Sequence, residues 1–156
     1  MVNFDWETIY RSSMFAFRRA SGKWFRFSLN GESSSLPEDI ASAVRKFGSL
    51  TIMTAWNPMS KERPLSANED ANAELRNRLE ASDFVFDESY GCSLPGVTPG
   101  WREDGFVIYG MSSDEAADWG NSVDQRSIVF ADEKEIGLLF CVEGRFVPCG
   151  VEQPGS

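Results

Sequence analysis

The chain has 156 residues, of which 42% are hydrophobic, and its formal net charge is −9 at pH 7. This length and apolar content predict one globular domain over residues 1–150, followed by a loose tail over residues 151–156. The acidic charge disfavours direct binding to nucleic-acid phosphates, and it serves either solubility or recognition of a basic protein partner. Because the sequence contains no histidine, Ser-His and Cys-His catalysis and histidine-ligated metals are excluded.

The cysteines and the hydropathy pattern limit the possible cellular locations of the protein. Cys92, Cys141 and Cys149 are odd in number and have no CxxC spacing, which argues against a disulfide framework or a zinc site. No apolar run approaches the ~18 residues needed to cross a bilayer, and the first residues, MVNFDWE, lack the features of a signal peptide. We therefore expect a cytoplasmic protein with no membrane contact. A glycine-rich phosphate-binding motif is absent, and we expect no metal and no cofactor.

The chain opens with a predicted helix and a hairpin. Residues 4–13 form the helix. Residues 14–19 and 23–29 lie on either side of Ser21-Gly22, which is typical of two antiparallel strands joined by a tight turn. In the second segment Phe25, Phe27 and Leu29 alternate with Trp24, Arg26 and Ser28, as expected of a strand with one buried face.

Three further helices share one start signal. In each, a serine that can cap a backbone N–H is followed three residues later by a glutamate that can reach back, which is the spacing of a capping box. The pairs are Ser35 with Glu38, Ser66 with Glu69, and Ser112 with Glu115, and they predict helices over residues 36–47, 67–81 and 113–123.

The remaining apolar segments predict strands. Residues 50–58, LTIMTAWNP, predict a central strand that is covered on both faces and stops at Pro58, which cannot continue a ladder. The overall order predicts an α+β or α/β domain with a mixed sheet flanked by three to four helices. Further strands are expected at residues 84–90, 105–110, 127–130, 136–142 and 145–148, with a charged turn at residues 132–135.

The helix predicted over residues 67–81 carries two amides on its buried side. At 100° per residue, Asn68 and Asn72 fall on one line with Leu75 and Leu79, which must face the core. Buried amides need partners, since an unmatched polar group costs about 1–3 kcal/mol. The short connection from the central strand brings Asn57 toward the same region. These amides therefore either tie that connection to the helix or line a polar pocket at the end of the strand.

Residues 91–102 are rich in glycine and proline and predict an irregular loop that forms a lid over this pocket. The loop delivers Trp101, as a plug over the core or a platform for a ligand. It also delivers Glu103, as a general base or an ordinary surface residue. Gln125 precedes a strand, where its side chain can point over the end of the sheet. Trp56, in the turn of the central strand, completes the candidate set.

Several of these motifs follow one another in a fixed order. The segment TAWNP at residues 54–58 is followed by Trp101, Glu103 and the run DQRSIVF at residues 124–130. This combination resembles DUF3293, a bacterial family of unknown function, over residues 7–142. Between the first two motifs, one helix carries Ser66, Asn68, Asn72, Leu75 and Leu79 at the matching spacing. The family has no established activity, so the resemblance implies a fold and a special end of the sheet, but no reaction.

Two functions of different classes remain. The first is a module that binds a small polar or nucleotide-like ligand, with aromatic rings stacking and amides hydrogen-bonding. The second is a protein-binding inhibitor or accessory factor from a phage or mobile element, such as an anti-CRISPR protein, whose acidic surface blocks a nucleic-acid-binding complex. The second requires one continuous acidic face, whereas the first requires convergence of its candidate residues in a cleft. Those candidates are Trp56, Asn57, Asn68, Asn72, Trp101, Glu103 and Gln125.

The case for an enzyme rests on Glu103 and Cys92. Without histidine, acid–base chemistry falls to Glu103, and no paired carboxylate is evident at a readable spacing. Cys92 is a candidate nucleophile, but the sequence offers no base to activate it. The sequence therefore favours a binding protein over an enzyme.

Overall fold

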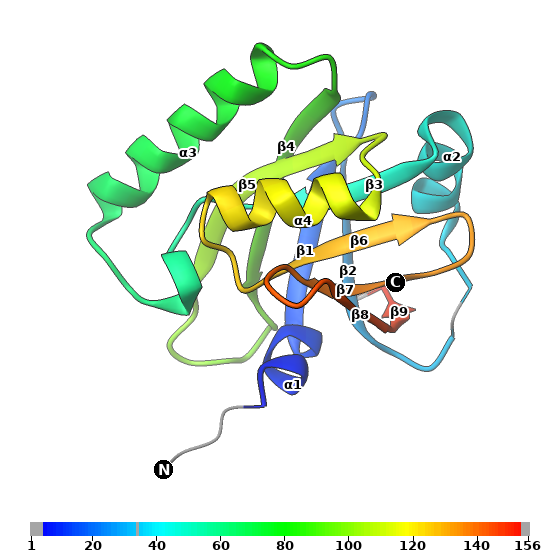
Figure 1. Ribbon diagram of the computed structural model, residues 1–156. Helices are drawn as coiled ribbons and strands as arrows, with labels where there is room; N and C mark the ends of the chain where they lie inside the picture. The colour runs from blue at the N-terminus through cyan, green and yellow to red at the C-terminus, as the bar shows by residue number, and fades with distance from the viewer. Residues whose placement is uncertain (1–4, 34, 154–156) are drawn as a thin grey trace.

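The strands of the computed structural model, which describes residues 5–33 and 35–153, form one nine-stranded sheet in the order β8-β7-β6-β3-β5-β4-β1-β2-β9 (Figure 1). The α-helices of the described residues are α1 (Trp6–Arg11), α2 (Glu38–Phe47), α3 (Leu65–Glu80) and α4 (Ser113–Ser122). The strands are β1 (Ser13–Arg18), β2 (Trp24–Gly31), β3 (Ser49–Met53), β4 (Val85–Ser93), β5 (Arg102–Tyr109), β6 (Ser127–Asp132), β7 (Ile136–Phe140), β8 (Arg145–Pro148) and β9 (Gly150–Glu152). A short 3₁₀ helix, η1 (Pro58–Ser60), follows β3.

Every pairing between the described strands is antiparallel, which corrects the expectation of a mixed sheet. The α+β class itself is confirmed. Two of the helical connections explain the difference. The connection through α3 leads from β3 to β4 and skips over β5, and the connection through α4 leads from β5 to β6 and skips over β3. Strands that run in the same direction are therefore never neighbours.

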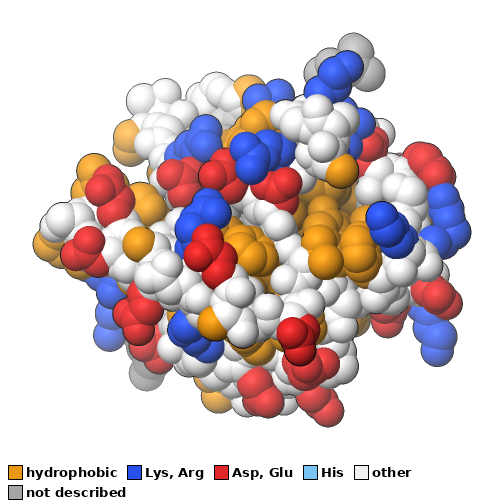
Figure 2. Space-filling view, turned by 90° about the horizontal axis from the view of Figure 1, so that it is seen from above, with side chains coloured by type: hydrophobic (Ala, Val, Ile, Leu, Met, Phe, Trp, Pro, Cys, Tyr) orange, Lys and Arg blue, Asp and Glu red, His pale blue; other side chains and the backbone are white. Residues whose placement is uncertain are grey.

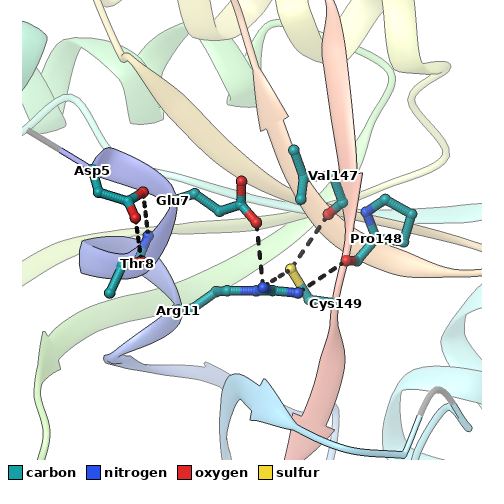
Figure 3. Close-up of polar contacts among 7 residues, drawn as sticks. All are labelled: Asp5, Glu7, Thr8, Arg11, Val147, Pro148 and Cys149. Atoms are coloured by element: carbon teal, nitrogen blue, oxygen red, sulfur yellow. Dashed lines mark hydrogen bonds and ion pairs between the residues drawn. The ribbon is translucent and has the colours of Figure 1, made fainter.

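The two edges of the sheet are joined by the chain itself. β8 ends at Pro148 and β9 begins at Gly150, so only Cys149 separates the two edge strands. Arg11 of α1 ties this junction down, because its guanidinium donates to the Pro148 carbonyl at 3.2 Å and to the Cys149 sulfur at 3.4 Å (Figure 3). A Cβ atom on Gly150 would collide with the Gly31 carbonyl, so glycine is required where β9 meets β2. The sheet therefore approaches a closed barrel.

The inner face of this curved sheet holds one hydrophobic core between two helices. In Figure 1, α2 lies at the upper end of the sheet and α1 at the lower end. Ile40 and Val44 of α2 are fully part of this core, and Trp6 and Tyr10 of α1 pack against it. The strands contribute mainly Phe17, Phe25, Phe27, Leu29, Leu50, Ile52, Val107, Val129, Ile136, Leu138 and Phe140.

The outer face carries a second core, which α3 and α4 cover. Leu75 and Leu79 of α3 are buried there, as the helical periodicity predicts, and Ala116 of α4 joins them. The strand residues beneath the helices include Met53, Phe106, Ile108, Ile128, Phe130 and Leu139. None of the described helices has both the length and the apolar character needed to cross a bilayer.

The expected central strand is buried along its whole length, but it is shorter than predicted. All five residues of β3 are buried, and the strand ends at Met53, so residues 54–58 form a turn instead of continuing the ladder. The expected tail also differs. Val151 and Glu152 belong to β9, which pairs with β2, whereas residues 154–156 lie outside the described part of the chain.

Only one of the three predicted capping boxes forms. Ser112 accepts the N–H of Glu115 at 3.1 Å, and the Glu115 carboxylate accepts the N–H of Ser112 at 3.1 Å. α2 and α3 instead begin after Pro37 and Pro64, without a capping side chain. Proline fixes φ near −65°, and the carbonyls of both prolines accept the first helical N–H groups. The prolines thus set the start of these helices.

This difference gives a paired test of stability. Ser112→Ala should lower the free energy of unfolding by about 1 kcal/mol, because the N–H of Glu115 loses its acceptor. Ser66→Ala should change it by less than about 0.5 kcal/mol, because Ser66 lies inside α3 and caps nothing. Urea unfolding of both variants measures the difference, and an equal loss in the two would contradict this account of the helix starts.

Candidate functional site

The turn after β3 has a backbone that most residues avoid. Asn57 has φ 44°, Met59 has φ 51° and Ser60 has φ 64°, all in the left-handed region. Asparagine tolerates this region, but methionine and serine adopt it at a cost of about 1–2 kcal/mol each. Asp124, the fourth described non-glycine residue with positive φ, accepts the N–H of Met59. The strained backbone is therefore gathered in one place, and such clusters often mark functional sites.

A pair of asparagines holds the turn in this shape. Asn68 of α3 is 3% exposed. Its Oδ1 accepts the backbone N–H of Asn57 at 2.9 Å, and its Nδ2 donates to Asn57 Oδ1 at 2.9 Å. Arg63 also donates to Asn68 Oδ1, at 2.6 Å, and to the Ala55 carbonyl at 2.8 Å. The prediction that these amides tie the connection to the helix is thus correct for Asn57 and Asn68.

The remaining donor of Asn57 points to Glu103. Asn57 Nδ2 donates to Glu103 Oε1 at 3.1 Å. Glu103 lies near the start of β5, in phase with Val107 of the inner core, so its side chain is on the inner face of the sheet. Burial raises the pKa of this carboxyl, and the hydrogen bond from Asn57 partly opposes the rise.

Gln125, Arg126 and Tyr10 of α1 contact the same turn from the side opposite α3. Gln125 is buried, and its Nε2 donates to the Trp56 carbonyl at 3.0 Å. Arg126 donates to the Met59 carbonyl at 3.3 Å. Tyr10 of α1 shares a hydrogen bond of 2.9 Å with Ser60. Burial raises the pKa of Tyr10, so its hydroxyl remains protonated at neutral pH.

These groups surround a cleft that leads into the inside of the sheet. The outer part, of about 140 Å³, is lined by Trp6, Ile9, Trp56, Asn57 and Ser60. The inner part, of about 70 Å³, is lined mainly by Phe15, Ile52, Ser89, Gly91, Ser127, Val129 and Leu138. Residues that line both parts, and so form the neck between them, are Tyr10, Ser13, Trp101, Glu103 and Gln125.

Two serine hydroxyls inside the cavity lack hydrogen-bond partners among the described residues. The Oγ atoms of Ser89 and Ser127 are both buried and unpaired. Ser127 lies near the Tyr10 hydroxyl and affects its pKa, but the two make no hydrogen bond of ordinary geometry. Buried polar atoms are normally satisfied, and exceptions often mark a place for water or a ligand.

The structure brings together most of the residues that the sequence singled out. Five of them line the cleft, and Asn68 supports it from behind. Asn72 does not join them, because it lies against the outer face of β4 and β5. The expected lid is also smaller than predicted, since β4 runs to Ser93 and β5 begins at Arg102. The five cleft residues are Trp56, Asn57, Trp101, Glu103 and Gln125.

Sequence reasoning missed the residues that α1 and the strand interiors contribute. The sequence placed Tyr10 in a short predicted helix but did not indicate that it belongs to the site, and nothing in the sequence indicated Arg63. Ser89 and Ser127 lie within strands, where a lone serine on the inner face is indistinguishable from one on the outer face until the phase of the strand is known.

The site offers an acid–base group, but Cys92 does not serve it as a nucleophile. Cys92 lies next to Gly91 in β4 and so faces the other side of the sheet, and burial raises the pKa of its thiol. It is neither in the cleft nor activated. Within the described residues, no group of three or more cysteine, aspartate or glutamate side chains is arranged to hold a metal ion.

Residues 53–128 match the family described as "Protein of unknown function (DUF3293)". The chain resembles this family. The match begins at the last residue of β3 and ends in β6, so the resemblance is shown over a shorter range than the motifs suggested. It contains all the candidate residues taken from the sequence, but not Tyr10 and Ser13, which form the opposite wall of the neck. No curated protein and no solved structure matches the chain.

The raised pKa of Glu103 predicts a pH dependence of stability. The folded protein holds the Glu103 proton more tightly than the unfolded chain, so stability falls as pH rises from the ordinary value of 4.5 through the raised pKa. Glu103→Gln removes this loss. The variant should match wild type in acid and exceed it at neutral pH. Urea unfolding across this range measures both, and parallel curves would contradict the assignment.

The asparagine pair predicts a second difference. Asn68→Ala leaves the Asn57 N–H and the Arg63 guanidinium without their acceptor, and it should lower the free energy of unfolding by about 2–3 kcal/mol. Asn72→Ala, one turn along the same helix, should lower it by less than about 1 kcal/mol, because Asn72 Oδ1 accepts no hydrogen bond among the described residues. Chemical denaturation measures the free energy of unfolding of both variants, and similar losses in the two would refute the special role of Asn68.

Proposed function

We propose that the chain is a binding protein for a small ligand that donates N–H hydrogen bonds to Glu103 and inserts an apolar group into the cavity behind it. The observation that carries this proposal is the position of Glu103. It lines both parts of the cleft, it is largely buried, and among the described residues it accepts one hydrogen bond, from Asn57. A carboxylate has about four acceptor sites, so a ligand with N–H donors would complete it.

The dimensions and chemistry of the cleft support a ligand with two unlike ends. Phe15, Ile52 and Leu138 give the cavity an apolar wall, and the unpaired hydroxyls of Ser89 and Ser127 add two hydrogen-bonding positions. Small closed sheets commonly hold one small ligand inside, and the mouths of barrels are frequent binding sites. A cavity of about 70 Å³ suits a short alkyl group or part of one ring.

The aromatic residues at the entrance suit the same kind of ligand. Trp101 is 43% exposed and lines the neck, and Trp56 lines the outer cleft. Exposed tryptophans beside a carboxyl favour flat or cationic groups, since a ring face attracts both. Amines and amidines combine an N–H donor with a positive charge that Glu103 would neutralise.

The alternative function, a protein-binding inhibitor, needs a continuous acidic surface. On the face shown in Figure 2, aspartate and glutamate side chains are interspersed with lysine and arginine. Several of the acidic groups are engaged in ion pairs, including Asp87 and Glu88 with Arg18 and Asp39 with Arg19. The face shown therefore does not favour the inhibitor, and the small-ligand function is preferred for the built cleft at Glu103. A cytoplasmic location belongs to the proposal and is supported by three cysteines that are all free.

A comparison of matched fragments tests this function. Benzylamine and benzamidine donate N–H groups, whereas benzyl alcohol has the same ring without them. We expect the two nitrogen compounds to shift the NMR signals of the Trp101 indole and the Gly91 amide saturably, at concentrations at least tenfold below those needed for benzyl alcohol.

Two variants of the full chain control the fragment experiment. Glu103→Gln should weaken benzamidine binding at least tenfold, because the carboxylate charge is lost. Glu135→Gln, in the exposed turn between β6 and β7, should leave it within twofold. Equal binding of the alcohol and the amine, or unchanged binding by Glu103→Gln, would rule out Glu103 as the recognition group.

A further inference from the structure

A separate hollow lies on the opposite face of β4 and β5, between these strands and α3. We call it the α3 pocket. It has a volume of about 180 Å³. Phe106, which lines it, belongs to the outer core, whereas the cleft at Glu103 opens on the inner face. Ser89 and Gly105 lie in the wall between the two and line both. The other polar and aromatic groups around the α3 pocket are Trp24, Asn72, Arg76, Glu88, Arg102 and Asp104.

Asn72 is the residue of this pocket that most needs a partner. It lies one turn after Asn68 on α3, on the same side of the helix. Its Oδ1 is buried and accepts no hydrogen bond from the described residues. An unsatisfied buried amide oxygen costs about 1–3 kcal/mol, and a donor from a molecule in the pocket would remove that cost.

Two arginines present guanidinium groups at the rim, each next to an aromatic ring and a carboxylate. Arg76 lies 5.0 Å from the centre of the Phe106 ring and pairs with Glu88 at 3.0 Å. Arg102 lies 3.9 Å from the centre of the Tyr90 ring and pairs with Asp104. Each guanidinium has five N–H donors, and the structure assigns one hydrogen bond to each. Both therefore have N–H donors left over, and both side chains are accessible from solvent.

Trp24 supplies a flat apolar wall beside these groups. Its ring lies 5.1 Å from that of Tyr90 at an angle of 49°, and the Tyr90 hydroxyl accepts the Nε of Arg26 at 2.7 Å. The tryptophan is partly exposed, so one region of its surface is open to a partner. Aromatic rings next to arginine form stacking surfaces for planar groups.

We propose that the α3 pocket binds a planar heteroaromatic ring of the nucleobase class, presented as a free base or nucleoside. The ring stacks on Trp24, donates an N–H to Asn72 and accepts hydrogen bonds from Arg76 and Arg102. A simple anion fits less well, because Glu88 and Asp104 already neutralise the two arginines. A nucleic-acid strand also fits less well, because the chain carries a net charge of −9.

Titration with adenosine, cytidine, guanosine and uridine tests this inference by NMR on the full chain. At least one nucleoside should shift the Trp24 indole and the Asn72 side-chain amide saturably. The Trp101 indole and the Gln125 amide, at the Glu103 cleft, should not shift. This separates the inference from the proposed function: failure here leaves the fragment result standing, and the reverse also holds. Saturable shifts at Trp101 instead of Trp24, or no saturable shift with any nucleoside, would overturn the inference.

Variants of the pocket residues and a control on α3 complete the experiment. Asn72→Ala should lower the affinity at least tenfold for the nucleoside that binds, and Trp24→Ala should do the same. Asn77→Ala, on the exposed side of the same helix, should leave binding within twofold. Thermal unfolding confirms that each variant is folded, and Asn72→Ser provides a second substitution if the alanine variant is not. Unchanged affinity in the folded Asn72 variant would overturn the assignment.

A short single-stranded oligonucleotide of mixed sequence distinguishes the source of the base. It should bind at least tenfold more weakly than the free nucleoside, because its phosphates meet the acidic chain. Tighter binding of the oligonucleotide that weakens with salt would overturn the choice of a free nucleoside.

Discussion

The closure of the sheet is the constraint from which the rest of this structure follows. Because β8 and β9 are the two edges and Cys149 alone joins them, the sheet must curl until its edges approach. A curled antiparallel sheet has an inside, and that inside must be filled or remain a cavity. Phe17 and Phe27 are among the large side chains that fill it. Toward α1 the inward residues are small, as at Gly91, and the cavity opens there.

The strained turn after β3 gives this opening its chemistry. Its left-handed residues are held by contacts from α1, α3 and the segment before β6, so its shape is determined from several sides. Asn57 shows that a structural and a binding role need not compete. Its backbone N–H and Oδ1 serve Asn68, which fixes the turn, and its Nδ2 serves Glu103, which orients the carboxyl. One residue thus links the fold to the site.

Local signals predicted the elements well and the long-range arrangement poorly. The buried strand β3 and the capping box of α4 depend on neighbours in sequence, and both are present. The order of the strands depends on which strand each helical crossover skips, and no local pattern encodes that. Asn72 was grouped with Asn68 because they share a helix side. Four residues of helix span about 6 Å, which is enough to carry Asn72 away from the turn and over the outer face of β4 and β5.

A contribution to stability does not explain why a glutamate occupies position 103. A largely buried carboxyl with a raised pKa and one hydrogen bond from the described residues destabilises the fold at neutral pH, and a glutamine would make the same contact with Asn57 without the charge. Residues that weaken a fold are characteristically those that a function requires. Tyr10, the other titrating group at the neck, also has a pKa raised by burial. Acid–base catalysis is better served by two groups whose pKa values are displaced in opposite directions. Glu103, which has acceptor sites left over, and Tyr10, which stays protonated, are better suited to binding a ligand with N–H donors.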